Sequence, residues 1–140
     1  MFAFGCATPA IEIKPFDKSA TVEASYDEVW NKLIRFTSTN DVSVSSVEKD
    51  SGLIVLSGDN LSQGVISQYC AAQAPFLSVL SSGTAKGSIV VTDDDGFVTV
   101  TVNAKFNTTF VNNMSSPPTY NTVPCNSTGA FETAVLGAIQ

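Results

Sequence analysis

The sequence contains no histidine, and this absence removes several common kinds of active site. Histidine is the usual general base, the commonest metal ligand and the central member of serine and cysteine catalytic triads. The sequence also lacks a Cys-x-x-Cys pair and a glycine-rich phosphate-binding loop. We therefore expect no catalytic, cofactor-binding or metal-binding residues, and we expect that the protein is not an enzyme.

Charge is also scarce. Charged residues make up 14% of the chain, whereas about 25% is typical of globular proteins. The formal net charge is −6, and no basic stripe is present. Nucleic-acid binding depends on lysine and arginine side chains that neutralise phosphates, so we predict no nucleic-acid partner. A surface rich in serine, threonine and asparagine in place of charge is typical of a protein outside the cytoplasm.

Long apolar runs are absent as well. No stretch of about 20 apolar residues occurs, so no helix is predicted to span a bilayer. The chain of 140 residues has the length of one domain, which is enough to bury a single core. We place this domain at residues 18–140. Residues 6–17 contain two prolines and are predicted to form an extended tether.

The first of the three cysteines has a distinctive context. The segment Ala3-Phe4-Gly5-Cys6 resembles a bacterial lipobox, in which apolar and small residues precede a cysteine. The resemblance implies that Cys6 is acylated and becomes the mature N-terminus. It also implies that residues 1–5 are the remaining tail of a signal peptide.

The residue after Cys6 is alanine rather than aspartate, which implies sorting to the periplasmic face of the outer membrane. The match to the lipobox departs at Ala3, where such motifs usually carry leucine. The alternative interpretation is an N-terminal arm whose Phe2 and Phe4 pack on the domain.

The other two cysteines, Cys70 and Cys125, remain as a pair. In an oxidising compartment we expect them to form a disulfide, because free thiols are oxidised there. The closed loop would be long, and chain entropy alone gives roughly 4 kcal/mol of stabilisation. The alternative is two unrelated buried thiols, since cysteine is often buried.

The first part of the domain predicts a strand followed by a helix. Residues Lys18 to Ala24 alternate between apolar and polar, as in a half-buried strand. Ser25 then begins a capping box with Glu28. Apolar residues recur at helical spacing from Tyr26, and the helix is expected to end at about Thr39, before Asn40-Asp41.

Two hairpins are predicted next. The first has a bulge near Ser45-Ser46, a turn at residues 49–52 and a second arm at Leu53 to Leu56. The second joins Ala85–Thr92 to Phe97–Phe106 through Asp93-Asp94-Asp95-Gly96, with Asp-Gly at the tightest point. We interpret these three carboxylates as a solvated turn, with a bound cation as the alternative.

The remaining segments are less regular. Val65 to Cys70 is expected to add a strand, whereas residues 71–84 fit either a short helix after Pro75 or an ordered loop. Residues 112–124 contain three prolines and are predicted to be a loop. A last helix is expected after an N-cap at Ser127 or Thr128, with Phe131, Val135, Ala138 and Ile139 buried.

This order of elements predicts an α+β two-layer sandwich, with an antiparallel sheet of about four to six strands and two helices on one face. The segments SYDEVWNKLIRF, SVEKDSGLIVLSG and CNSTGAFETAVLGAI resemble the helix-grip domains of BamC-like outer-membrane lipoproteins. These are structural residues, so the resemblance implies the fold, a helix-grip or TBP-like sandwich, more than an activity. A fainter resemblance links the chain to the Bet v 1/START class.

We expect a non-enzymatic lipoprotein of the bacterial envelope that acts through protein–protein contacts, in outer-membrane assembly or maintenance. Its expected partners are the membrane, through the lipid on Cys6, and an envelope protein. One alternative is a binder of a small apolar ligand, in a cavity lined by Trp30 and phenylalanines. Another is an inhibitor of a host hydrolase that uses the 112–124 loop, braced by Cys125.

Overall fold

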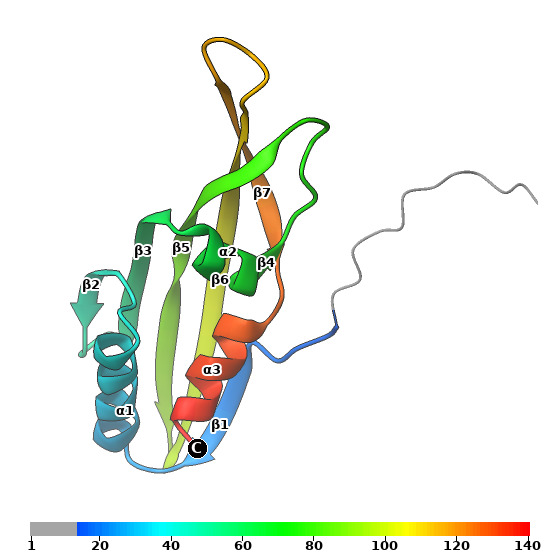
Figure 1. The fold of residues 1–140 in the computed structure, drawn as a ribbon. Coiled ribbons are helices and arrows are strands. Elements are labelled where there is room, and N and C mark those ends of the chain that lie inside the picture. Colours follow the sequence, from blue (N-terminus) through cyan, green and yellow to red (C-terminus); the bar gives the residue numbers. More distant parts are fainter. Residues whose placement is uncertain (1–13) are drawn as a thin grey trace, which may run out of the picture.

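A computed structural model describes residues 14–140, so the expected signal-peptide tail and Cys6 lie outside the described residues. Within this range Figure 1 shows one antiparallel sheet with three helices, which confirms the predicted α+β class. The helices are α1 (Tyr26–Thr39), α2 (Gln63–Tyr69) and α3 (Ala130–Ala138). The strands are β1 (Ser19–Glu23), β2 (Val44–Glu48), β3 (Leu53–Leu61), β4 (Cys70–Ala71), β5 (Val79–Asp94), β6 (Phe97–Asn112) and β7 (Thr119–Ser127).

The long β5–β6 hairpin forms the centre of the sheet, and the strand order is β2-β3-β5-β6-β7-β4. Two strands share the outer edge of β6. Strand β1 pairs with its first part, where Val22 lies opposite Val98. Strand β7 pairs with its last part, where Asn121 lies opposite Phe110. Strand β6 is therefore longer than either β1 or β7, and a different strand pairs with each of its two ends.

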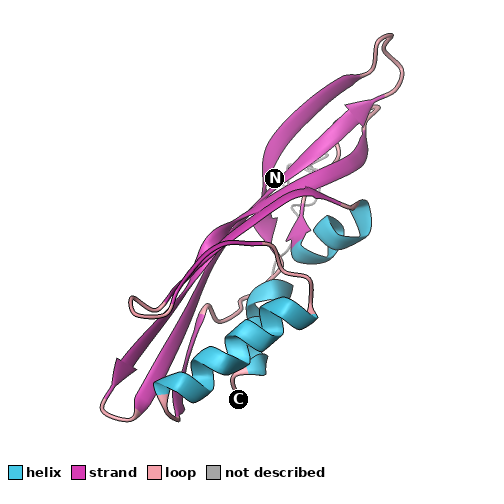
Figure 2. Ribbon diagram, turned by 90° about the vertical axis from the view of Figure 1, so that its left-hand side faces the viewer, coloured by secondary structure: helices cyan, strands magenta, loops and turns pink. Residues whose placement is uncertain are grey.

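The core lies between the sheet and the helices. Figure 2 shows the three helices on the same side of the sheet, and the far end of the sheet extends past them. Alternate residues of the central strands are buried, as expected when one face of a strand is covered. The buried set includes Ile54, Leu56, Ile89, Val91, Val98, Val100, Val102 and Phe106 of the sheet, Val29, Trp30, Leu33, Ile66, Phe131, Val135 and Leu136 of the helices, and Cys70 and Ile139.

Helix α1 begins and ends where the sequence predicts. The Ser25 Oγ accepts a hydrogen bond from the backbone N–H of Glu28, so the expected cap is present. The Tyr26 hydroxyl donates to the Lys49 carbonyl and ties α1 to the β2–β3 turn. Burial raises the pKa of this Tyr26 hydroxyl above its ordinary value. The cap and this tether fix the orientation of α1 on the sheet.

The two predicted hairpins are present, and the second is longer than predicted. The register shifts between Val44 and Ser46, which confirms the expected bulge. Asp95 and Gly96 both have positive φ at the β5–β6 turn, as a tight two-residue connection requires. Strand β6 continues beyond Phe106, its predicted end, because the next side chains that face the core are either apolar, as at Phe110, or hydrogen-bonded, as at Thr108. Thr108 and Phe110 are each 2% exposed.

Three predictions about the less regular segments are wrong. Val65 to Cys70 is not a strand but belongs mostly to α2. The Ser62 Oγ accepts a hydrogen bond from the backbone N–H of Val65 and caps the helix, while Ile66 and Tyr69 lie on one side of it. The sequence 112–124 is not all loop. Residues from Thr119 form β7, where Pro124 is tolerated at a sheet position without an outer neighbour. Within residues 14–140 the sheet consequently has seven strands and three helices accompany it, instead of about four to six strands and two helices.

Residues 71–84, for which two conformations were open, contain no helix. After the short strand β4, the chain forms a loop that ends at Val79, where β5 begins. Helix α3 begins slightly later than predicted, and its N-cap is Gly129 with no side-chain cap bond. The hydroxyl oxygen of Ser127 instead accepts from the backbone N–H of Gly129, and that of Thr128 accepts from the backbone N–H of Ala130, the first residue of the helix.

Candidate functional site

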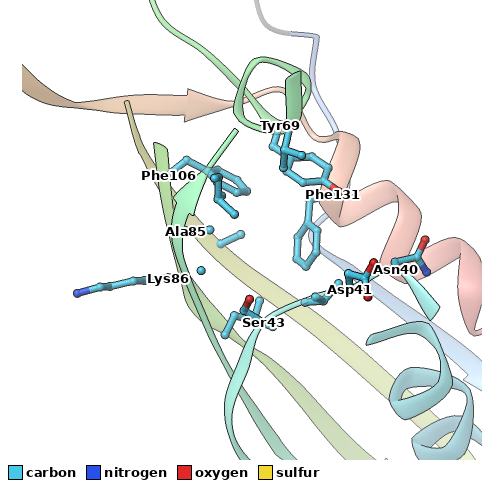
Figure 3. A pocket seen from close by; sticks show the side chains of 14 residues that line it. Asn40, Asp41, Ser43, Tyr69, Ala85, Lys86, Phe106 and Phe131 are labelled. Atoms are coloured by element: carbon cyan, nitrogen blue, oxygen red, sulfur yellow. The ribbon is translucent and has the colours of Figure 1, made fainter. Parts of the chain in front are cut away.

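A cavity of about 300 Å³ opens beneath α2, between the helices and the sheet. Figure 3 shows its walls, which come from six different parts of the chain. The segment between α1 and β2 forms the mouth, and β3, β5 and β6 form one wall. Helices α2 and α3 close the opposite side. The lining residues are Asn40, Asp41, Val42, Ser43, Leu56, Gly58, Leu61, Val65, Tyr69, Ala85, Lys86, Ala104, Phe106 and Phe131.

Three aromatic rings form the inner end of this cavity. The ring of Tyr69 stacks on Phe106 with centroids 5.9 Å apart, and it meets Phe131 edge-on at 5.7 Å. Phe106 and Phe131 also meet edge-on, at 6.4 Å. Such edge and offset contacts are favourable geometries for aromatic pairs. The rings contact one another from α2, β6 and α3 and together form the inner wall.

Small residues of the sheet leave the space open. Ala85 of β5 lies opposite Phe106 in the register, and Ala104 of β6 lies opposite Gly87. Cross-strand partners point to the same face, so both alanines face the helices together with the Phe106 ring. Larger side chains at these two positions would occupy the cavity. The void therefore depends on small residues contributed by two neighbouring strands.

The mouth of the cavity is polar. Figure 3 shows Asn40, Asp41 and Ser43 along the opening, whereas the Lys86 side chain points away from it. The backbone here is held in place: Asn40 Nδ2 donates to the Phe36 carbonyl at 2.9 Å, and Asp41 has a φ of 52°. The mouth thus presents one exposed carboxylate and neutral polar groups.

A second feature is the segregation of charge between the two ends of the sheet. Residues 60–85 and 106–131 contain no aspartate, glutamate, lysine or arginine. The register places these two ranges side by side, from Ala85 opposite Phe106 to Val79 opposite Val111. We call them together the uncharged half. Every charge of the described chain lies elsewhere, mostly near α1 and β1 and at the β2–β3 and β5–β6 turns.

Exposed apolar side chains gather at the far end of the uncharged half. This part of the chain, at the top of Figure 1, contains the loops before β5 and after β6. Five of the eight large apolar residues that are exposed in the structure lie there. We call them the tip: Phe76, Leu77, Val79, Met114 and Tyr120, of which Phe76 is 89% exposed.

The outer edge of β7 is open next to the tip. Strand β4 pairs with β7 only at Asn126 and Ser127. Among the described strands, none pairs with the outer edge of residues 119–125. Backbone N–H and C=O groups at an open edge are available to pair with another chain.

The structure brings together the two cysteines that were expected to pair. The sulfur atoms of Cys70 and Cys125 lie 2.01 Å apart, the distance of a disulfide bond. The bond joins the end of α2 to β7, and Thr128 strengthens the same connection through a hydrogen bond to the Gln68 carbonyl. Cys6, the predicted site of lipidation, lies outside the described residues.

The carboxylates at the start of α1 and in the β5–β6 turn are exposed. Asp27 lies 2.9 Å from Lys49 Nζ, and Glu28 lies 3.9 Å from Lys32 Nζ, both at the surface. Asp95 occupies the β5–β6 turn. Within residues 14–140 no group of three or more potential ligands is arranged to hold a metal ion. No described helix is long and apolar enough to cross a membrane.

One buried carboxylate was missed by sequence reasoning. Glu132 of α3 is 1% exposed, and the Ser127 hydroxyl lies 2.8 and 2.9 Å from its two oxygens. A buried carboxylate requires such a donor, because an unpartnered charge is costly away from water. The spacing Ser-x-x-x-x-Glu resembles no standard cap, so the pattern gave no signal. The pair fixes the connection between β7 and α3.

Trp30, expected to line a ligand cavity, does not do so. Its side chain is 4% exposed and stacks on Tyr26 with ring centroids 6.0 Å apart. The cavity uses Phe106 and Phe131 instead, together with Tyr69. No family model matches this chain, and no match was found among curated proteins.

Proposed function

We propose that the protein is a non-enzymatic component of the bacterial envelope that acts through protein–protein contacts made by its uncharged half. The observation that carries the proposal is the absence of charge from residues 60–85 and 106–131 together with the exposed apolar tip. Cores of protein interfaces are depleted of charge and rich in aromatic residues and methionine. The tip has this composition.

A protein partner fits this surface better than a bilayer does. The open edge of β7 carries backbone groups that hydrocarbon cannot satisfy, and open sheet edges do not occur in lipid. A partner that adds an extended segment beside residues 119–125 would satisfy those groups. Its side chains would be apolar or neutral where they meet Met114 and Tyr120. We propose this strand addition as the mode of contact.

The proposed contact is tested by charge at the tip. We expect M114D and Y120D to lower the yield of a discrete protein cross-link by about tenfold or more, because central aromatic contacts dominate interface energies. The cross-link would be formed in the native cells from a photoreactive residue at position 122. The product is identified by mass spectrometry.

The matched control is V47D, which places the same charge on an exposed valine of β2, far from the tip. This variant should cross-link as the wild type does. Equal losses in all three variants would contradict the proposal. Photoproducts formed with phospholipid instead of protein would place the tip in a membrane and would also contradict it.

We further propose that the domain is a two-layer sandwich of the helix-grip class, related to the BamC-like lipoproteins, with its anchor at Cys6. The likeness of SYDEVWNKLIRF and CNSTGAFETAVLGAI to those domains supports this, as do the lipobox-like residues before Cys6. A stable anchor requires more than one acyl chain, which a mature bacterial lipoprotein carries. The proposed location is the periplasmic face of the outer membrane.

The anchor has a direct test. Metabolic labelling with palmitate should mark the wild-type protein, and C6S should lose the label and leave the membrane fraction. V47D keeps Cys6 and the disulfide and serves as the control, because it should retain the label. Label that persists in C6S would show that Cys6 is not acylated.

A further inference from the structure

We propose that the cavity between α2, α3 and the sheet binds one small uncharged amphiphile, an apolar body with a neutral hydroxyl or carbonyl end. This site is separate from the tip and does not depend on the protein contact proposed above. The size of the cavity, the character of its walls and the charge at its mouth support the assignment of this ligand class.

The size sets the class of molecule. The cavity has a volume of about 300 Å³, at the lower end of the range found for ligand sites. Since each water takes about 30 Å³ in the liquid, the space corresponds to roughly ten non-hydrogen atoms. A medium-length aliphatic chain or a single substituted ring fits this volume, whereas a two-chain lipid does not.

The walls select an apolar body. The inner end consists of the rings of Tyr69, Phe106 and Phe131, and the sides include Leu56, Leu61 and Val65. A closely packed protein leaves little space of this kind between helices and sheet, whereas here a cavity opens to solvent at its mouth. Here the void persists where Ala85 and Ala104 face aromatic rings. An apolar occupant would restore the missing contacts.

The mouth disfavours an anion. Asp41 presents an exposed carboxylate at the opening, and the ammonium of Lys86 points away in Figure 3. No other charged side chain lines the cavity. An anionic head group such as a fatty-acid carboxylate would lie beside a like charge without a cationic partner, which is unfavourable. Asn40 and Ser43 at the mouth offer hydrogen-bonding partners to a hydroxyl or carbonyl.

The proposal is tested with 1-decanol and decanoate, which have the same chain and differ in the charge of the head group. Isothermal titration calorimetry of the full chain should show saturable one-to-one binding of 1-decanol. The dissociation constant of decanoate should be higher by about tenfold or more, because its carboxylate would lie near the Asp41 carboxylate. Similar affinities for the two would overturn the assignment of a neutral head group.

Variants that fill the cavity locate the binding. A104L and A85V enlarge side chains that line it, and filling a void does not oppose folding. Both should lose 1-decanol binding by about tenfold or more while urea unfolding midpoints stay equal or rise. A134L enlarges an exposed residue of α3 and should bind as the wild type does. Undiminished binding by both cavity variants, or no binding by the wild type, would overturn the proposal.

Discussion

Replacing Cys70 and Cys125 together with alanine is expected to lower the free energy of unfolding by about 4 kcal/mol. The two residues lie 55 positions apart in the chain, so the bond closes a long loop and removes much of the entropy of the unfolded state. Urea unfolding followed by the fluorescence of Trp30 measures the loss. Trp30 is the only tryptophan and is buried in the core, so its emission reports global unfolding.

The reduced wild-type protein provides the control for this experiment. With a reductant present, the wild type should unfold at the same urea concentration as the double alanine variant. A loss smaller than about 1 kcal/mol would show that closing the loop contributes little to stability. If the C70A single variant keeps the unfolding free energy of the wild type when no reductant is present, another cysteine pairing replaces this one.

The second large effect is expected at Ile66. The I66A variant should lose about 2–5 kcal/mol of stability, the usual cost of truncating a large buried aliphatic residue. Ile66 is 0% exposed and is the only buried residue of α2. It packs against the backbone of Gly83, where no side chain separates the helix from β5. Truncation therefore removes the main apolar contact that holds α2 on the sheet.

Denaturant unfolding of I66A should be compared with that of Q68A, which changes an exposed residue of the same helix. Q68A is expected to alter stability by no more than about 0.5 kcal/mol. An equally small effect of I66A would mean that α2 contributes little to the stability of the sheet.

The elements that were predicted correctly carry strong local signals. Helix α1 combines a cap at Ser25 with apolar residues at helical spacing, and both features act within a few residues. The β5–β6 hairpin combines strict alternation with an Asp-Gly turn. Such signals survive in the folded protein because tertiary packing agrees with them.

The elements that were missed depend on neighbours far along the chain. Strand β7 contains Pro124 and has no clear period, and it is a strand because β6 offers a partner from Phe106 to Asn112. Helix α2 has only seven residues, too few for a full apolar pattern, and Ile66 decides its placement through Gly83. Short segments of this kind are determined by tertiary contacts rather than by propensity.

The candidate sites divide in the same way. The pairing of Cys70 with Cys125 was predicted by setting Cys6 aside as a lipidation site and assuming an oxidising compartment, and the two sulfur atoms do lie at disulfide distance. The cavity could not be predicted, because it arises where Ala85 and Ala104 of two strands face Tyr69 and Phe131 of two helices. Charge segregation is visible in the sequence, but only the register of β5 and β6 shows that the two uncharged ranges form one surface.

The lack of ionisable carboxylates and amines in the uncharged half has a consequence for the conditions under which it works. Residues 60–85 and 106–131 contain no aspartate, glutamate, lysine or arginine, and their two cysteines are joined in the disulfide. Contacts made there therefore involve no charged side chain that dissolved salt could screen. A change of ionic strength alters the electrostatic potential around α1 and β1, where the charged residues lie, while the far end of the sheet keeps the same uncharged surface.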